Sequence, residues 1–225
     1  MNIYGKSAAI VVRTILHLLC KVDKRELKKL PRKGPYIIAM NHINFLEVPM
    51  IFVDLFPRKI HGIAKKETWD NPVLKILANI WETVPIDREG FTANTFRKVK
   101  EHLGNDKIII IAPEGTRTGD GKLKKAHPGI ITMAQQSDVP IYPVVHFGGE
   151  LFWDNLVKFK RTRFTFEVGK PIKIKKVKST DKSIRHKQVD QLMFRMAELL
   201  PEKYRGNYKD IDKINNKYVE EVEDE

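Results

Sequence analysis

The sequence predicts an α/β fold, a single layered domain in which a mixed, largely parallel sheet is flanked by helices. Almost wholly apolar runs at residues 35–40 and 107–112 have the length of buried strands, and the second contains four consecutive isoleucines. Helical patterns lie between such runs, and strands that alternate with helices are typical of layered sheets with parallel strands. A length of 225 residues fits one large domain.

The remaining elements follow from the same patterns. We expect further strands at 60–64, 83–86 and 141–147, and helices at 46–55, 72–80, 92–103, 129–136 and 183–200. Residues 162–168 alternate polar with aromatic side chains, which is typical of a strand near the edge of a sheet. We predict three parts: an amphipathic, membrane-associating helix at 1–22, the main domain at 23–200, and a helical C-terminal extension at 201–225 with a frayed acidic tail.

The most apolar stretch, residues 8–20, is interrupted by Arg13 and His17. A membrane-spanning helix needs about 20 apolar residues, so this stretch is not expected to cross a bilayer. It is a poor signal peptide as well, because Arg13 breaks the apolar run and no small-residue cleavage site follows. At helical spacing it forms an apolar arc beside basic residues. Such a helix can lie in a headgroup layer with its basic residues toward anionic lipid, or it can dock on its own domain.

The chain is strongly basic, with 41 Lys and Arg against 28 Asp and Glu. Five of the acids lie in the last eight residues, so residues 1–217 hold 41 basic and 23 acidic side chains, a formal charge of +18. Such a domain attracts polyanions: nucleic acid, an anionic membrane surface, phosphorylated substrates or an acidic carrier protein. Charge alone does not choose among these partners.

The single cysteine, Cys20, excludes an internal disulfide framework and a cysteine-rich zinc module. We also find no set of His, Asp or Cys whose spacing demands a metal. The sequence therefore predicts a fold held by packing alone and a site without metal.

Ligands of open α/β sheets usually bind beyond the carboxyl ends of the strands, so the residues that follow each strand are the candidates. His42 follows the first expected strand, and Glu47 lies five residues further on. If the chain turns at Asn44 and a helix begins at Phe45, Glu47 can orient the imidazole of His42 as a general base. Asn44 and Glu47 also have the spacing of a capping box, in which Glu47 only satisfies the start of the helix.

Two other strand ends carry arginines. Residues 113–117, Pro-Glu-Gly-Thr-Arg, follow the isoleucine strand; there Gly115 permits a positive φ, and Arg117 offers a planar fork that suits phosphate. Arg88 follows the strand expected at 83–86. Taken singly, the first segment is also explained as an ordinary turn with a surface arginine, and Arg88 as the partner of a neighbouring acid.

Together these segments resemble, in order and spacing, the glycerolipid acyltransferase superfamily, specifically the bacterial 1-acylglycerol-3-phosphate acyltransferases. The resemblance covers about residues 8–170, in four blocks at 41–47, 84–88, 113–117 and 139–144. Residues 64–67, which include Lys65, resemble a lysine-bearing stretch of the same family. The chain departs from the family pattern at Glu47, where Asp is usual, and at Glu82, Ala112 and His127.

The resemblance implies an O-acyltransferase that moves a fatty acyl group from acyl carrier protein or coenzyme A to the sn-2 hydroxyl of 1-acylglycerol 3-phosphate, making phosphatidic acid. His42 would be the catalytic base and Glu47 its orienter. The residues that would bind phosphate and glycerol are Lys65, Arg88, Glu114, Gly115, Thr116 and Arg117. No cofactor beyond the acyl donor is implied. The protein would be peripheral, on the cytoplasmic face of an anionic membrane.

Two alternatives stay open. The first keeps the fold and changes the acceptor to glycerol 3-phosphate, another lysophospholipid or a lyso-aminolipid. The second is a non-catalytic basic module on a membrane or nucleic acid, which the aromatic and basic residues at 158–166 support in part. A basic module leaves the ordered motifs at the strand ends unexplained, so we expect no nucleic-acid partner.

Overall fold

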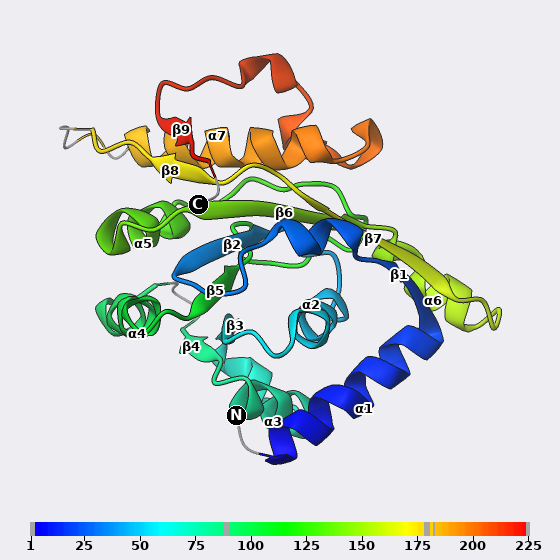
Figure 1. Cartoon of the computed structure of the whole chain (residues 1–225). Helices are drawn as coiled ribbons and strands as arrows, with labels where there is room; N and C mark the ends of the chain where they lie inside the picture. Colours follow the sequence, from blue (N-terminus) through cyan, green and yellow to red (C-terminus); the bar gives the residue numbers. More distant parts are fainter. Residues whose placement is uncertain (1–2, 88–90, 178–180, 182, 224–225) are drawn as a thin grey trace.

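A nine-stranded sheet runs through the part of the chain that the computed structural model describes, residues 3–87, 91–177, 181 and 183–223 (Figure 1). The main path of the sheet has the order β1-β7-β6-β2-β5-β3-β4, and β8 and β9 extend it beside β6. The strands are β1 (Cys20–Asp23), β2 (Tyr36–Met40), β3 (Ile60–Lys65), β4 (Val84–Ile86), β5 (Ile108–Ile111), β6 (Ile141–Phe147), β7 (Thr162–Val168), β8 (Ile172–Ile174) and β9 (Val219–Glu221).

The centre of the sheet is parallel, as predicted. β2 pairs with β5 and β6, β5 also pairs with β3, and β3 pairs with β4, all in the parallel sense. The carboxyl ends of these five strands therefore meet at one edge of the sheet. Every residue of β2 and of β5 is buried, which explains why both strands are visible in the sequence as unbroken apolar runs.

Helices cover both faces of the sheet (Figure 1). On one face, α4, α5 and α7 pack over Ile37 and Ala39 of β2; on the other, α1 and α2 pack over Ile38 and Met40. The helices are α1 (Ile3–Leu19), α2 (Glu47–Leu55), α3 (Pro72–Ile80), α4 (Ala93–Gly104), α5 (Gly129–Ser137), α6 (Phe152–Leu156) and α7 (Ser183–Leu199). Short 3-10 turns are η1 (Arg25–Lys29), η2 (Lys66–Asp70), η3 (Gly149–Leu151), η4 (Glu202–Tyr204), η5 (Gly206–Tyr208) and η6 (Ile211–Lys213).

The antiparallel side of the sheet contains elements that the patterns did not predict. β7 pairs with β6 in the antiparallel sense, as its alternating burial allows. β1 then pairs with β7 on the outside, so β7 lies one strand inside the edge. β1, β8 and the short helix α6 are missing from the predicted elements because each is too short to show a period in the sequence.

The acidic end is ordered as far as Glu223, which differs from the expected frayed tail. Val219–Glu221 forms β9 and pairs with β8, where Glu220 lies opposite Lys173. The Glu221 carboxylate also lies 3.2 Å from the ammonium of Lys170. The basic segment after β7 thus contacts the acidic tail through β8 and one ion pair. The expected helical extension is a series of 3-10 turns, η4 to η6, followed by this strand.

The expected N-terminal helix is present as α1, and it docks on α2 through Ala9 and Leu16. Two of its basic residues, the half-exposed Arg13 and the part-buried His17, lie beside an acid of α2. The His17 ring lies 2.9 Å from the buried carboxylate of Asp54 in α2, and Arg13 lies 3.7 Å from it, because a buried charge needs opposite charges nearby. A second apolar row, Ile10, Val11, Ile15 and Leu18, is exposed. Among the described residues, we find no helix with the length and apolar character of a membrane span.

Candidate active site

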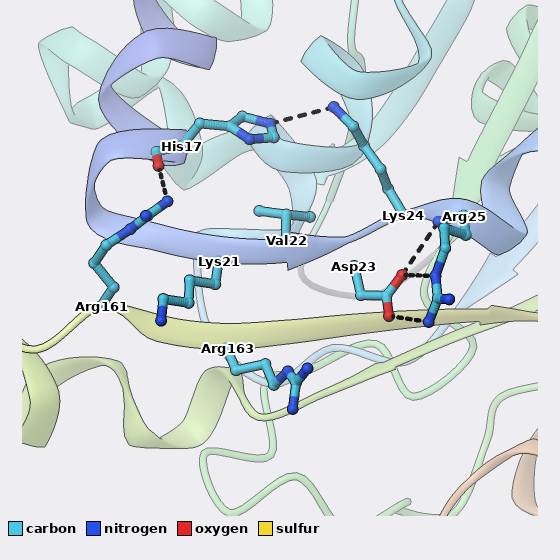
Figure 2. A pocket seen from close by; sticks show the side chains of 8 residues that line it. All are labelled: His17, Lys21, Val22, Asp23, Lys24, Arg25, Arg161 and Arg163. Atoms are coloured by element: carbon cyan, nitrogen blue, oxygen red, sulfur yellow. Dashed lines mark hydrogen bonds and ion pairs between the residues drawn. The ribbon is translucent and has the colours of Figure 1, made fainter.

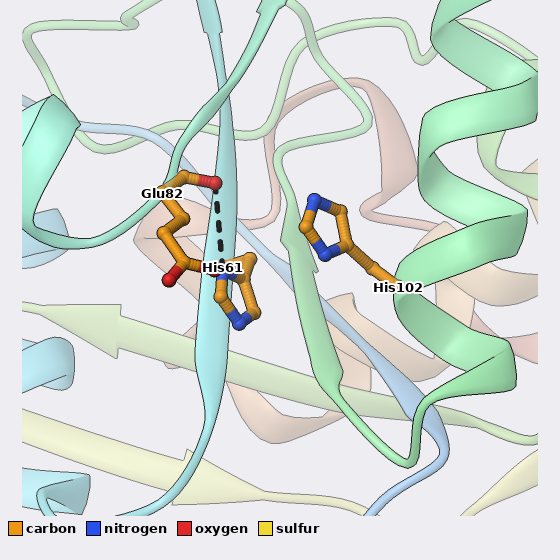
Figure 3. Close-up of side chains that lie close together, drawn as sticks. All are labelled: His61, Glu82 and His102. Atoms are coloured by element: carbon orange, nitrogen blue, oxygen red, sulfur yellow. Dashed lines mark hydrogen bonds and ion pairs between the residues drawn. The ribbon is translucent and has the colours of Figure 1, made fainter. Parts of the chain in front are cut away.

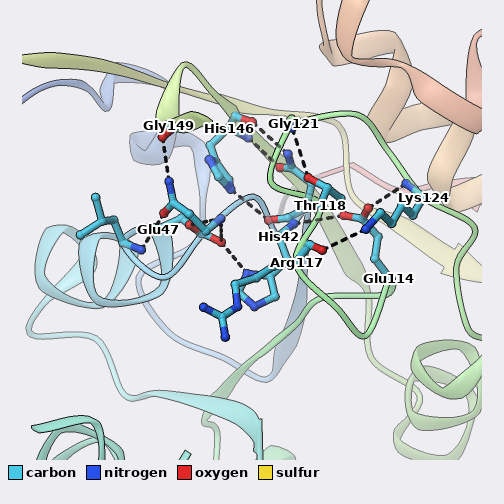
Figure 4. A network of polar contacts seen from close by, with 12 residues as sticks. His42, Glu47, Glu114, Arg117, Thr118, Gly121, Lys124, His146 and Gly149 are labelled. Carbon is cyan, nitrogen blue, oxygen red and sulfur yellow. Dashed lines mark hydrogen bonds and ion pairs between the residues drawn. The ribbon is translucent and has the colours of Figure 1, made fainter. Parts of the chain in front are cut away.

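The loops that follow β2 and β5 are joined to each other at the carboxyl edge of the sheet (Figure 4). The backbone N–H of Thr118 donates to the carbonyl of His42 at 2.8 Å, and the N–H of Gly119 donates to the carbonyl of Ile43 at 3.0 Å. The structure therefore brings the predicted histidine segment and the Pro-Glu-Gly-Thr-Arg segment together, as adjacent parallel strands require.

His42 and Glu47 form a direct contact, with 2.5 Å between Nδ1 of the ring and Oε1 of the carboxylate. The Glu47 side chain is wholly buried, whereas a quarter of the His42 side chain is exposed. The carboxylate accepts a hydrogen bond from the N–H at Nδ1. Nε2 is then the nitrogen that can take a proton from a substrate. Glu has one methylene more than the Asp that is usual here, and the loop accommodates it without loss of the contact with the ring.

The turn between these two residues differs in detail from the expected one. The helix begins at Glu47, not at Phe45, and Asn44 caps the preceding turn by accepting the N–H of Leu46 at 2.8 Å. The N–H of Asn44 donates to both oxygens of Glu47 at 3.2 Å. Glu47 thus satisfies the backbone at the start of α2 and contacts His42 at the same time, so the two interpretations of the spacing are compatible.

Glu114 is buried behind the loop that carries His42. Its Oε1 accepts the backbone N–H of His42 at 3.1 Å, and its Oε2 accepts the N–H of Lys124 at 2.8 Å. Burial raises the pKa of Glu114 to about 7, although the two N–H donors lower it. In this position the carboxylate holds the backbone on both sides of the site.

Gly115, Thr116 and Arg117 lie at the surface beyond Glu114. Gly115 has a φ of +65°, and a Cβ there would lie 3.1 Å from the ring of His127, so the turn favours glycine twice over. The Arg117 side chain points to the same side of the loop as the His42 ring (Figure 4). The ammonium of Lys124 donates a hydrogen bond to the carbonyl of Arg117 at 3.0 Å, which connects the loop to the following segment.

Lys65 lies at the same edge, exposed at the end of β3, which is separated from β2 by β5. Two strand spacings place it about 10 Å across the sheet from the His42 strand. Its neighbour Lys66 forms an ion pair with Asp87, which follows β4. Arg88 lies outside the described residues, so its predicted place in the site is not tested.

Comparison with known proteins identifies the family. Residues 21–146, more than half of the chain, match the family model described as Acyltransferase. The chain belongs to this acyltransferase family. A 1-acyl-sn-glycerol-3-phosphate acyltransferase of Bacillus subtilis is 28% identical over 168 residues, which cover 74% of this chain and 81% of that protein. The enzyme of the same name from Limnanthes alba is 35% identical over 68% of this chain, which spans only 53% of the plant protein.

A solved structure shares the fold of this acyltransferase. It is the 1-acyl-sn-glycerophosphate (LPA) acyltransferase PlsC from Thermotoga maritima, with a TM-score of 0.61, 20% identity, and coverage of 87% of this chain and 79% of that one. At this identity the likeness bears on the fold, and it supports the predicted α/β architecture with a mostly parallel sheet.

Two residues of the acyltransferase site were missed by the sequence patterns. The Asn41 side-chain amide donates to the carbonyl of His146 at 2.9 Å, and its oxygen accepts the N–H of His146 at 2.9 Å. The His146 ring, fully buried in β6, donates through Nε2 to the carbonyl of Asn41 at 3.0 Å. Burial lowers the pKa of His146. The only signal in the sequence is a polar residue at the end of an apolar strand.

A group of potential metal ligands lies at the opposite edge of the sheet (Figure 3). His61 near the start of β3, Glu82 and His102 place their ligand atoms within 4.8 Å of one another. The ammonium of Lys107 lies 3.0 Å from the carboxylate of Glu82 and 3.2 Å from Nδ1 of His102, and the two imidazole rings are stacked. The contacts of this cluster are therefore explained by its binding of the Lys107 ammonium, at the edge of the sheet opposite His42.

Proposed function

We propose that this O-acyltransferase transfers a fatty acyl group from acyl carrier protein or coenzyme A to the sn-2 hydroxyl of 1-acylglycerol 3-phosphate, making phosphatidic acid. The observation that carries the proposal is the His42–Glu47 contact beside the loop that presents Arg117. The names of the Bacillus, plant and Thermotoga relatives support the same acceptor.

His42 acts as the general base. An alcohol is a weak nucleophile at neutral pH, so Nε2 of His42 takes the hydroxyl proton while the oxygen attacks the thioester carbonyl. Glu47, bonded to Nδ1, stabilises the imidazolium that forms. When the tetrahedral intermediate collapses, the carbon–sulfur bond breaks and the imidazolium returns its proton to the thiolate. The protein forms no covalent acyl intermediate in this scheme, and the buried Cys20, whose pKa burial raises to about 11, takes no part.

Cationic side chains at the same edge hold the acceptor phosphate. Arg117 offers two parallel donors to phosphate oxygens, and Lys65 adds a point charge from the end of β3. Arg88, in the second matching block, completes the set in this proposal. Holding the phosphate fixes where the hydroxyl points, which is the main contribution of such groups to the rate. The thioester and the acceptor are the only small molecules that this mechanism uses.

The test is an acyl-transfer assay with the purified protein and three acceptors: lysophosphatidate, glycerol 3-phosphate and dephosphorylated lysolipid. We expect the highest kcat/KM with lysophosphatidate and little transfer to the dephosphorylated lysolipid. Preference for glycerol 3-phosphate would support the same chemistry with the other acceptor. Equal rates with and without the phosphate would reject the phosphate-binding role of the arginines. Acyl carrier protein and coenzyme A thioesters, compared in the same assay, identify the donor.

A further inference from the structure

The turn between α6 and β7 presents an aromatic side chain to solvent at a strained position. Phe159 is 99% exposed, and its backbone has a φ of +52°, in the left-handed region that bulky residues rarely adopt. Glycine or asparagine would fit this backbone better and would leave no apolar ring in water. Folding stability therefore gives no reason for a phenylalanine here, whereas a partner that covers the ring would.

Phe159 belongs to a larger apolar surface, which we call the apolar tip and define by Leu18, Trp153, Val157 and Phe159. Their exposed fractions are 72, 58, 73 and 99%. One guanidinium joins the two segments that carry them, because Arg161 donates to the carbonyls of His17 and Cys20, at the end of α1, at 2.5 and 2.7 Å. The end of α1 and the α6–β7 turn are thus held next to each other. Exposed apolar side chains that gather in one region of a surface mark an interaction site.

Basic residues border the apolar tip. Lys158, Lys160 and Arg161 lie in the turn itself, and all three are exposed. Behind the turn, a hollow of about 880 Å³ is lined mainly by basic residues of β1, of the segment that follows it, and of the start of β7 with the residue before it (Figure 2). Lys21 of β1 lies in register with Arg163 of β7, and both side chains point to the same side of β1. Apolar side chains with a border of lysine and arginine complement a leaflet that contains anionic lipids.

The apolar tip lies at the catalytic edge of the sheet. α6 follows the carboxyl end of β6, which is parallel to β2, so it lies at the same edge as His42. β7 runs back from this edge and β1 is parallel to β7, so the end of α1 lies there as well. The ring of Phe45, in the catalytic loop, lies 5.8 Å from the ring of Trp153. This ring contact links α6 to the loop that carries His42.

We propose that the apolar tip inserts into the anionic leaflet of a membrane, with Phe159 among the acyl chains and Lys158, Lys160 and Arg161 at the lipid phosphates. In this orientation the catalytic loop faces the leaflet, and a lipid acceptor reaches His42 along Trp153 and Phe45. The proposal deepens the proposed function, since it supplies the membrane contact, but vesicle binding does not depend on acyl transfer.

The test is sedimentation of the full-length protein with vesicles of phosphatidylcholine alone or mixed with phosphatidylglycerol. We expect Phe159→Asn to weaken binding to the anionic vesicles about tenfold, as the loss of one buried aromatic side chain implies. Val177→Asn is the matched control, because Val177 is also exposed beside lysines, but it follows β8 at the opposite edge of the sheet. Equal binding by wild type and Phe159→Asn would overturn the proposal.

The unfolding temperature of Phe159→Asn distinguishes a role of Phe159 in membrane binding from a role in packing. Because asparagine tolerates a positive φ, Phe159→Asn should unfold at the same temperature as the wild type or higher. Weaker vesicle binding together with a lower unfolding temperature would assign Phe159 to packing instead. A polarity-sensitive dye on Phe159→Cys reports insertion directly, since the native Cys20 is buried and not labelled. We expect a blue shift with anionic vesicles at position 159 and none at position 177.

Acyl transfer distinguishes this proposal from the proposed function. With a short-chain lysophosphatidate that stays monomeric in solution, Phe159→Asn should work at the wild-type rate, and it should lose rate only with an acceptor in vesicles. A wild-type protein that binds vesicles but transfers no acyl group would reject the enzyme chemistry and keep the apolar tip. If Phe159→Asn instead weakens binding to single-stranded DNA and leaves vesicle binding unchanged, the tip contacts nucleic acid and the proposal is wrong.

Discussion

The buried carboxylate of Glu114 accepts the backbone N–H of His42 at 3.1 Å, so a side chain of the loop after β5 holds the backbone of the histidine that follows β2. Its second oxygen accepts the N–H of Lys124 at 2.8 Å. A residue placed between two backbone donors and 1% exposed does not touch an acceptor directly. By resemblance Glu114 would help to place the glycerol, and its contacts indicate that it would do so by holding the loops.

The first prediction concerns the pH dependence of stability. Burial raises the pKa of Glu114 from 4.5 to about 7. Between pH 4.5 and pH 7 the folded protein therefore keeps a proton on Glu114 that the unfolded chain releases. This contribution is full below pH 4.5 and is lost as the pH rises through 7, in total about 3 kcal/mol. Urea unfolding of wild type and Glu114→Gln should show a difference in free energy that falls over this range. A difference that does not vary with pH would contradict a protonated Glu114.

His42→Ala tests the general base. A positioned histidine accelerates proton transfer by roughly 10² to 10⁴-fold, and we expect kcat to fall by this factor while KM for the acceptor changes little. His186→Ala, an exposed histidine of α7, is the matched control and should keep the wild-type rate. Circular dichroism checks that both variants fold. Unchanged turnover by His42→Ala would remove this residue as the base.

Glu47→Asp tests the fit of the longer carboxylate. The backbone at the start of α2 places Glu47 so that its carboxylate reaches Nδ1 at 2.5 Å, and an aspartate on the same backbone is one methylene too short. A misplacement of this size costs up to about a hundredfold in rate. Although Asp is the usual residue in the family, we therefore expect Glu47→Asp to be slower here. A variant as fast as the wild type would show that the loop adjusts.

Arg117→Ala tests the phosphate contact. Loss of hydrogen bonds to a charged group costs about 1.5–3 kcal/mol, so kcat/KM for lysophosphatidate should fall about tenfold to a hundredfold. Transfer to the dephosphorylated lysolipid, already slow, should not change. Lys122→Ala removes the same charge from an exposed residue of the same loop and serves as the control. If both variants lose equally, the effect is the general charge of the loop and not the arginine fork.

The strands and helices that position the site are visible in the sequence because they are regular and buried. The four isoleucines at Ile108–Ile111 point to both faces of the sheet, and each face is covered, so no polar residue interrupts them. The strand ends then place His42 and Arg117 at one edge by topology alone. The contact of His42 with Glu47 was predictable too, because the two lie only five residues apart.

What the sequence did not show depends on partners far along the chain. The sequence left open whether α1 lies on lipid or docks on its own domain, and it did not show that Arg13 and His17 lie beside Asp54, whose burial no pattern reveals. The acidic tail was expected to fray, yet Val219–Glu221 pairs with β8, with Glu220 opposite Lys173. Asn41 and His146 are 105 residues apart, and they meet only through the register of β2 with β6.

The Asn41–His146 pair leads to the last prediction. His146→Phe keeps the ring volume beside Phe164 and Phe166 but leaves the carbonyl of Asn41 without this donor, which costs about 1–3 kcal/mol at pH 8. Burial lowers the pKa of His146, so as the pH falls below about 6.5 the unfolded wild type binds a proton that the folded wild type does not. The wild type therefore loses the His146 contribution toward acid, whereas the variant has no such contribution to lose. The difference between their free energies of unfolding should shrink from pH 8 to pH 5. Urea unfolding at both pH values measures it. If the difference in free energy of unfolding is the same at both pH values, burial does not keep His146 neutral in the folded protein.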